Sequence, residues 1–117
     1  MDEKKLLYIN PESGLERFIG NENLYRDYLE RFLYDGAFEE FCSAVAIADI
    51  AMADQSLHTL MGTSANLSLE RLHYSASEAA RKITSQETDL DVEAIVNGVQ
   101  QVYSDTCMAV RKYLGHE

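Results

Sequence analysis

The sequence predicts an all-α fold: an antiparallel up-and-down four-helix bundle with a short additional helix at the N-terminal end. Three observations lead to this prediction. Apolar residues recur at spacings of three and four rather than two. The chain has one proline and six glycines and is rich in residues that favour helices. Its 117 residues, 46% of them hydrophobic, suit a single domain over 1–117 with one core.

Capping residues and apolar stripes define the expected helices. Gly20 and Gly115 are placed to end helices in a left-handed conformation. The polar stretch TSQETD separates the last two helices. The expected elements are about 11–19 after Asn10 with Pro11 at its first position, a helix from Asn21 to the interruption at Asp35-Gly36, about 37–47, about 50–65 after Asp49, a helix from Ser68 to Ile83, and about 90–114.

Each expected helix carries one apolar stripe that should face the core. The stripe of the fourth helix runs through Ile50, Ala53, Leu57, Leu60 and Ser64. The other core candidates are Leu24, Tyr25, Tyr28, Leu29 and Phe32; Phe38, Phe41, Ala44, Val45 and Ala48; Leu69, Leu72, Ala76, Ala79 and Ile83; and Val92, Ile95, Val99, Val102, Thr106, Val110 and Tyr113.

Charge and cysteine content exclude several classes of protein. Twenty acidic and ten basic residues give a net charge of -10, which repels nucleic-acid phosphates and anionic membrane surfaces. No apolar run approaches the roughly 18 residues that would span a bilayer. Cys42 and Cys107 are too few and too distant for a disulfide framework, and the start MDEKKLLYIN lacks the apolar core of a secretory signal. We therefore expect a cytoplasmic protein.

Familiar catalytic and metal-binding motifs are missing from the sequence. It has no glycine-rich phosphate loop, no paired-cysteine zinc spacing, no HExxH and no serine elbow. The three histidines, His58, His73 and His116, lie 15 and 43 residues apart, unlike the i, i+4 spacing of metal ligands on a helix. We expect no metal site and no independent catalytic machinery.

His58 is the strongest candidate for a functional residue. On a helical wheel it lies about 100° from Leu57 and roughly 120° from the middle of the apolar stripe, so it should project into solvent. Small or polar neighbours share its face, namely Ala51, Gln55, Gly62 and Ala65. Gly62 costs the helix about 1 kcal/mol relative to alanine, which a close approach of a phosphoryl group or of another protein would explain. Alternatively, Gly62 marks a loop or a tight helix crossing, and His58 is an ordinary surface histidine.

The run His58-Thr59-Leu60-Met61-Gly62-Thr63-Ser64-Ala65-Asn66 resembles the signature of histidine-containing phosphotransfer (HPt) domains. That signature reads His, any residue, Leu, Lys, Gly, then small residues and often Asn. The segment INPESGLERFIGNENLYRDYLERFLYD resembles the first two helices of the family. ADIAMADQSLHTL resembles the lead-in to its phosphorylated helix, and LSLERLHYSASEAARKI its next helix. The resemblance covers nearly the whole chain.

The resemblance implies a phosphorelay carrier. His58 would accept a phosphoryl group from the receiver-domain aspartate of a hybrid histidine kinase and pass it to the receiver of a response regulator, with Nε2 as the attacking atom. Such carriers have no cofactor of their own, because the partner receiver supplies Mg²⁺ and the acidic pocket. Positioning and charge neutralisation are what phosphoryl transfer chiefly requires. We expect a monomer.

Two departures from the family pattern affect the expected site. Met61 stands where relatives usually carry a lysine, so one cation beside the phosphoryl group is missing. Ala80 stands where many relatives carry a Glu or Gln that orients the imidazole. Arg81 is a candidate replacement for the missing cation, although a solvated surface arginine is the simpler interpretation.

Docking of a receiver should rely on apolar and small side chains around His58, because the negative charge of the chain opposes an acidic partner. The candidates are Leu15, Phe18, Ile19, Met61 and Ala65, with Gln55 beside the ring; each apolar one could instead be core, the interpretation we favour for Phe18. Two alternative functions remain open. One is a degenerate HPt-like adaptor that docks receiver or kinase domains without carrying phosphate, and the other is a helical bundle with an unrelated structural role.

Overall fold

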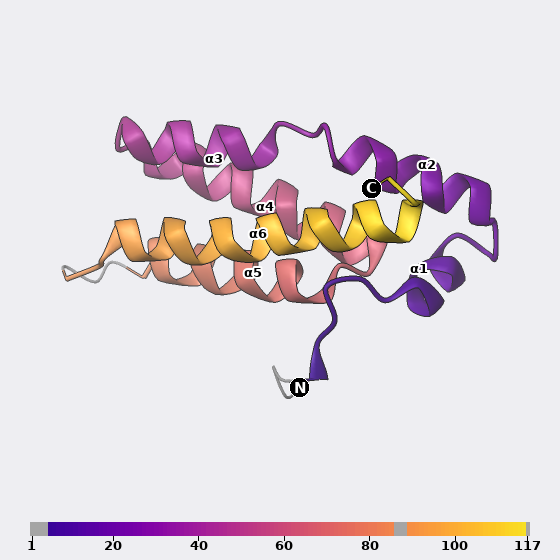
Figure 1. Cartoon of the computed structure of the whole chain (residues 1–117). Coiled ribbons are helices and arrows are strands. Elements are labelled where there is room, and N and C mark those ends of the chain that lie inside the picture. The colour runs from indigo at the N-terminus through magenta and orange to yellow at the C-terminus, as the bar shows by residue number, and fades with distance from the viewer. Residues whose placement is uncertain (1–4, 86–88, 117) are drawn as a thin grey trace.

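Six α-helices occur in residues 5–85 and 89–116, the part of the chain that the computed structural model describes (Figure 1). They are α1 (Pro11–Arg17), α2 (Glu22–Phe32), α3 (Ala37–Ala46), α4 (Ile50–Leu67), α5 (Glu70–Ile83) and α6 (Val92–Leu114). No strand occurs in these residues, so the all-α prediction is confirmed.

The helices form an up-and-down bundle. Figure 1 shows α2 and α3 following one another along one side of the molecule, while α4, α5 and α6 run alternately back and forth beside them. Both α2 and α3 pack against α4 and α6, and α5 packs against α4 and α6 as well. The short α1 packs against α4 and α2. The predicted bundle with an extra N-terminal helix is thus confirmed, with its first long helix broken between α2 and α3.

Most of the predicted helix ends are confirmed. The side chains of Asn10, Asn21 and Asp49 each accept a hydrogen bond from a main-chain N–H in the first turn of the following helix. Gly20 and Gly115 adopt positive φ angles of 72° and 82° after α1 and α6. Local chemistry alone therefore positions these turns.

The predicted N-cap at Ser68 is wrong. Ser68 instead ends α4 in the left-handed region, with φ 58°, and Leu69 is the N-cap of α5 without a side-chain hydrogen bond. Leu67 and Leu69 are both buried, so the core holds this short turn in place without a polar cap. The Ser68 hydroxyl donates a hydrogen bond to the Ser13 hydroxyl, which ties the turn to α1.

The bounds of several helices also differ by one or two residues from the prediction. The first helix ends at Arg17, the third at Ala46 and the fourth at Leu67, and α6 begins at Val92 after Asp91 as N-cap. Such differences are usual, because helix ends fray and their last turns tighten. Residues 86–88 of the expected TSQETD connection lie outside the described residues.

One cluster of buried apolar side chains forms the core, with contributions from α2 to α6. The predicted stripes supply most of it. Leu24, Tyr28, Ala48 and Ile50 were also predicted to face the core, but they are exposed. Ala48 lies in the turn between α3 and α4, and Ile50 is the first residue of α4, so both stand at the end of the bundle. In α2 only the narrower stripe of Tyr25, Leu29 and Phe32 is buried. No helix among the described residues is both long and apolar enough to cross a membrane.

Candidate functional site

His58 lies on the outer face of α4, as its helical position predicts. Ala53, Leu57 and Leu60 on the same helix are buried, whereas the His58 side chain keeps 60% of its surface exposed. The imidazole is therefore held by a helix that the core fixes, and it is open to a partner. A buried His58 would have favoured an unrelated structural role, but the side chain is exposed.

The surroundings of Gly62 explain why the ring stands clear. Gly62 lies inside α4, one turn after His58, and a Cβ added to it would meet nothing within 4 Å. The alternative interpretations of Gly62, a loop or a tight helix crossing, are therefore wrong. Ala51 and Gln55 on this face are exposed, and Ala65 is half-buried.

Asp54 is the closest charged neighbour of the ring, and the sequence analysis missed it. Its Oδ1 lies 3.4 Å from Nε2 of His58. This oxygen is shielded from solvent, and no described group makes a hydrogen bond to it. The spacing of four residues could have revealed the pair, because side chains at i and i+4 meet on a helix.

Two grooves flank the exposed face of α4. The groove toward α2 has a volume of about 510 Å³, and Gly62 is one of its lining residues. Arg31 is its basic residue, ion-paired to Asp27 at 2.9 Å and placed over the ring of Tyr28. We call this the α2 groove; its lining residues are Tyr28, Arg31, Phe32, Asp35, Gly62, Thr63, Asn66 and Leu67.

The groove toward α1 and α5 has a volume of about 440 Å³ and includes Ala65. Arg17 of α1 and His73 of α5 also line it. The His73 Nδ1 lies 3.0 Å from the main-chain carbonyl of Met61. A carbonyl only accepts, so this nitrogen carries the proton and His73 is held in one tautomer. We call this space the α1 groove.

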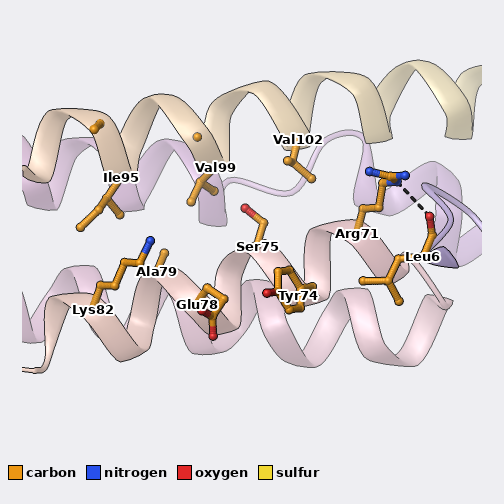
Figure 2. Close-up of a pocket in the computed structure, with 12 residues that line it drawn as sticks. Leu6, Arg71, Tyr74, Ser75, Glu78, Ala79, Lys82, Ile95, Val99 and Val102 are labelled. Atoms are coloured by element: carbon orange, nitrogen blue, oxygen red, sulfur yellow. Dashed lines mark hydrogen bonds between the residues drawn. The ribbon is translucent and has the colours of Figure 1, made fainter. Parts of the chain in front are cut away.

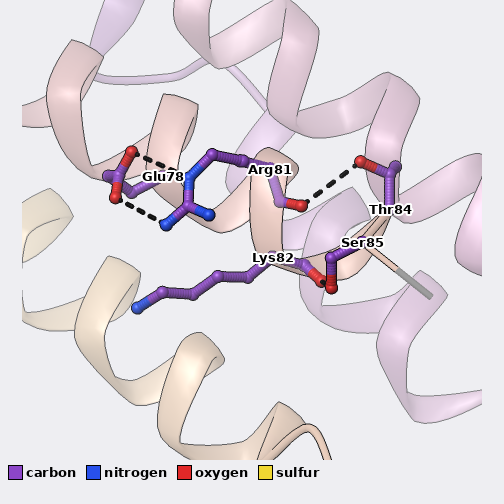
Figure 3. A network of polar contacts seen from close by, with 5 residues as sticks. All are labelled: Glu78, Arg81, Lys82, Thr84 and Ser85. Carbon is purple, nitrogen blue, oxygen red and sulfur yellow. Dashed lines mark hydrogen bonds and ion pairs between the residues drawn. The ribbon is translucent and has the colours of Figure 1, made fainter. Parts of the chain in front are cut away.

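The residues predicted around the phosphoryl site are only partly brought together. Met61 is half-buried against the core. Ala80 is buried in α5. Arg81 donates from Nε and Nη2 to the two carboxylate oxygens of Glu78 on its own helix, at 3.3 and 3.0 Å (Figure 3). This hydrogen bonding lowers the pKa of the Glu78 carboxyl, so the guanidinium is engaged by a charged partner.

The docking candidates of the N-terminal helix differ in exposure. Leu15 and Phe18 are half-buried against the core, and the Phe18 ring packs on Tyr25 and Tyr28 with centroids 5.4 Å away in each case. Ile19 is 94% exposed and has a φ of 55°. A β-branched residue rarely adopts this conformation, so an exposed apolar side chain is presented there at a cost in strain.

A third groove, of about 330 Å³, lies between α5 and α6 (Figure 2). Arg71 lies at one end of the groove and donates to the carbonyl of Leu6 at 2.9 Å. Glu78 and Lys82 line it farther along α5, and Gly98 belongs to its α6 wall. His58 is not among its lining residues.

Metal-binding groups do not gather anywhere in the described residues: no set of three or more His, Cys, Asp or Glu side chains could hold an ion. Cys42 and Cys107 are both free thiols. Comparison of the chain with protein families, with curated proteins and with solved structures finds no match.

Proposed function

We propose that this chain is a histidine phosphotransfer protein of a cytoplasmic two-component phosphorelay. His58 accepts a phosphoryl group from the receiver-domain aspartate of a hybrid histidine kinase and passes it to the receiver of a response regulator. The observation that carries the proposal is an exposed imidazole on a core-anchored helix with open space at Gly62, within a bundle of the expected helix order.

The chemistry asks little of the carrier itself. The lone pair of Nε2 attacks phosphorus, the P–O bond to the receiver aspartate breaks with its electrons going to the carboxylate, and Nδ1 of His58 keeps its proton. Charge neutralisation comes from the Mg²⁺ and cationic residues of the receiver. The small number of catalytic groups around His58 agrees with a mechanism in which the receiver supplies most of them.

Charge also bears on how a receiver docks. The net charge of -10 repels an acidic partner at long range. The two grooves beside the His58 face each contain one arginine and one acidic residue, Arg31 with Asp35 and Arg17 with Glu70, so their lining lacks the acidic excess of the chain as a whole. Apolar contact comes from Ile19 and from the small residues of α4, which leave room for another protein surface.

The test is phosphoryl transfer from a phosphorylated receiver in the presence of Mg²⁺, using receivers encoded beside this protein. Acid-labile label should appear on the wild-type chain and disappear in His58→Gln. His116→Gln is the matched control, because His116 is also exposed and also contacts a carboxylate, that of Glu30. Absence of label on the wild type, or equal label on His58→Gln, would contradict the proposal.

A second candidate function is an HPt-like adaptor that binds receivers or kinases without carrying phosphate. Two observations favour it: Met61 provides no cation, and the Asp54 carboxylate lies beside the ring. Receiver binding that is unchanged in His58→Ala, together with no phosphohistidine in the wild type, would establish the adaptor. A wild-type chain that neither binds receivers nor takes up label would contradict both candidates.

A further inference from the structure

In the contact between Asp54 and His58, a negatively charged carboxylate lies beside the nitrogen that would accept the phosphoryl group. Oδ1 of Asp54 lies 3.4 Å from Nε2, the atom that must bond to phosphorus in the proposed reaction. A carboxylate in this place repels an incoming phosphoryl group, since both carry negative charge. The contact therefore opposes the reaction as long as it persists.

The buried oxygen of Asp54 favours a hydrogen bond from the His58 ring. Oδ1 is shielded from solvent and has no hydrogen bond from any described group, although the Asp54 side chain as a whole is 30% exposed. A carboxylate oxygen without a donor is unfavourable, and the nearby imidazole of His58 can supply a donor. A small rotation of the imidazole aligns Nε2–H with Oδ1, because side chains at i and i+4 already meet on the helix.

We infer that Asp54 is a specificity-determining residue that holds the proton on Nε2 of the resting His58. The neutral ring then carries its lone pair on Nδ1, so Nε2 cannot attack phosphorus. A docked receiver turns the ring away from Asp54 and frees Nε2, whereas a small phosphoryl donor has no surface with which to do so. Asp54 thereby makes phosphorylation depend on a protein partner. The assignment of a role in transfer rests on the proposed function.

The level of Asp54 in the bundle fits this role. The bond from His73 to the Met61 carbonyl sets the register of the antiparallel α4 and α5. Seven residues away in each helix, Asp54 and Ala80 stand at the same height. Ala80, the residue of α5 at this height, carries no polar group, and the charged neighbour of His58 comes from its own helix.

The first test reads the tautomer of His58 by ¹⁵N NMR in the free protein, under alkaline conditions in which imidazole is neutral. In the wild type the Nε2–H form should dominate. In Asp54→Asn, and further in Asp54→Ala, the ratio should shift toward Nδ1–H by about fivefold, the effect of one hydrogen bond of ordinary strength. His73 is an internal reference, because its bond to Met61 keeps it in the Nδ1–H form in every variant.

Glu93→Gln is the matched control, since it removes one exposed carboxylate in the first turn of α6 and changes the net charge equally. It should leave the His58 tautomer unchanged. A tautomer ratio that is the same in the wild type and both Asp54 variants overturns the inference. A wild-type ring that is mainly Nδ1–H overturns it as well.

The second test measures phosphorylation by phosphoramidate without any partner. Nε2 forms the N–P bond, the P–N bond of the donor breaks, and ammonia leaves from its already protonated amine. We expect Asp54→Asn to react about fivefold faster than the wild type and than Glu93→Gln, while transfer from a receiver changes much less. An unchanged or slower reaction overturns the inference.

The two proposals fail separately. A wild type that takes no phosphate from receivers contradicts the proposed function, and the tautomer measurement still decides whether Asp54 holds the ring. Normal transfer together with an Asp54-independent tautomer contradicts the role of Asp54 alone.

Discussion

Gly14 and Gly62 both lie inside helices, yet their surroundings differ. A Cβ on Gly14 would lie 2.4 Å from the ring of Tyr25, so the packing of α1 on α2 requires glycine at this position. A Cβ on Gly62 would meet nothing within 4 Å. Both glycines cost helix stability, by about 1 kcal/mol each. Packing within the chain accounts for the first cost, whereas the proposed function would account for the second through the approach of a partner to α4.

The largest expected effect comes from Gly14→Ala. The new methyl group collides with a fully buried ring that cannot move freely, and overpacking of this kind destabilises by about 1–3 kcal/mol. We expect a loss near the upper end of that range in the free energy of unfolding, measured with a chemical denaturant. A variant as stable as the wild type would show that α1 can shift away from Tyr25, and the contrast between the two glycines would disappear.

Tyr25→Phe should have the next largest effect. The Tyr25 hydroxyl donates to the carbonyl of Leu67 at 2.9 Å in the buried region, and its loss should cost about 1–2 kcal/mol. Oη of Tyr25 is also one of the atoms that a methyl group on Gly14 would meet, so the double variant should lose less than the sum of the single ones. Strictly additive losses in denaturant unfolding would contradict a shared contact.

Burial raises the pKa of Tyr25, so the stability difference between the wild type and Tyr25→Phe should depend on pH. The folded hydroxyl keeps its proton at a pH where an unfolded tyrosine, with a pKa of about 10, loses it. Stability should therefore fall as pH rises above about 10. Burial raises the pKa of Tyr103 too, so Tyr25→Phe should weaken the alkaline loss without abolishing it. An identical pH dependence in the variant would contradict this account.

The ends of the helices could be predicted where a side chain bonds to its own neighbourhood. Asn10, Asn21 and Asp49 cap helices by contacts within three residues, so the sequence contains all the information. Ser68 has the right side chain for an N-cap, but the burial of Leu67 and Leu69 prolongs α4 to this residue. Ile50 continues the stripe by spacing, and only the tertiary arrangement shows that the bundle ends beside it.

In the candidate site, too, some features could be predicted from the sequence and others could not. The direction of His58 follows from helical period, and the structure confirms its exposure. The shielding of the Asp54 oxygen and the engagement of Arg81 by Glu78 depend on rotamers that the residue order does not specify. The free space beside Gly62 needed coordinates, because the same glycine could have served a tight crossing.

Gly62→Ala and Gly98→Ala form a matched pair with a smaller effect on stability. Both glycines are exposed within long helices, and a Cβ on either meets nothing within 4 Å. Each variant should gain about 0.5–1 kcal/mol, because alanine restricts the unfolded chain. Only Gly62→Ala should slow phosphoryl transfer from a receiver, since Gly98 belongs to the groove between α5 and α6. Equal transfer rates would mean that no partner approaches α4 at Gly62.

The smallest expected effect separates strain from docking at Ile19. Ile19 and Ala48 both have positive φ angles, 55° and 58°, and both are exposed, so replacing either with glycine should relieve strain and stabilise the fold by about 0.5 kcal/mol. Ala48 precedes α4, whereas Ile19 follows α1, which packs on α4. If Ile19 is kept for its apolar contact with a receiver, Ile19→Gly should weaken receiver binding, measured by calorimetry, and Ala48→Gly should not. Equal affinities would confine the role of Ile19 to the turn itself.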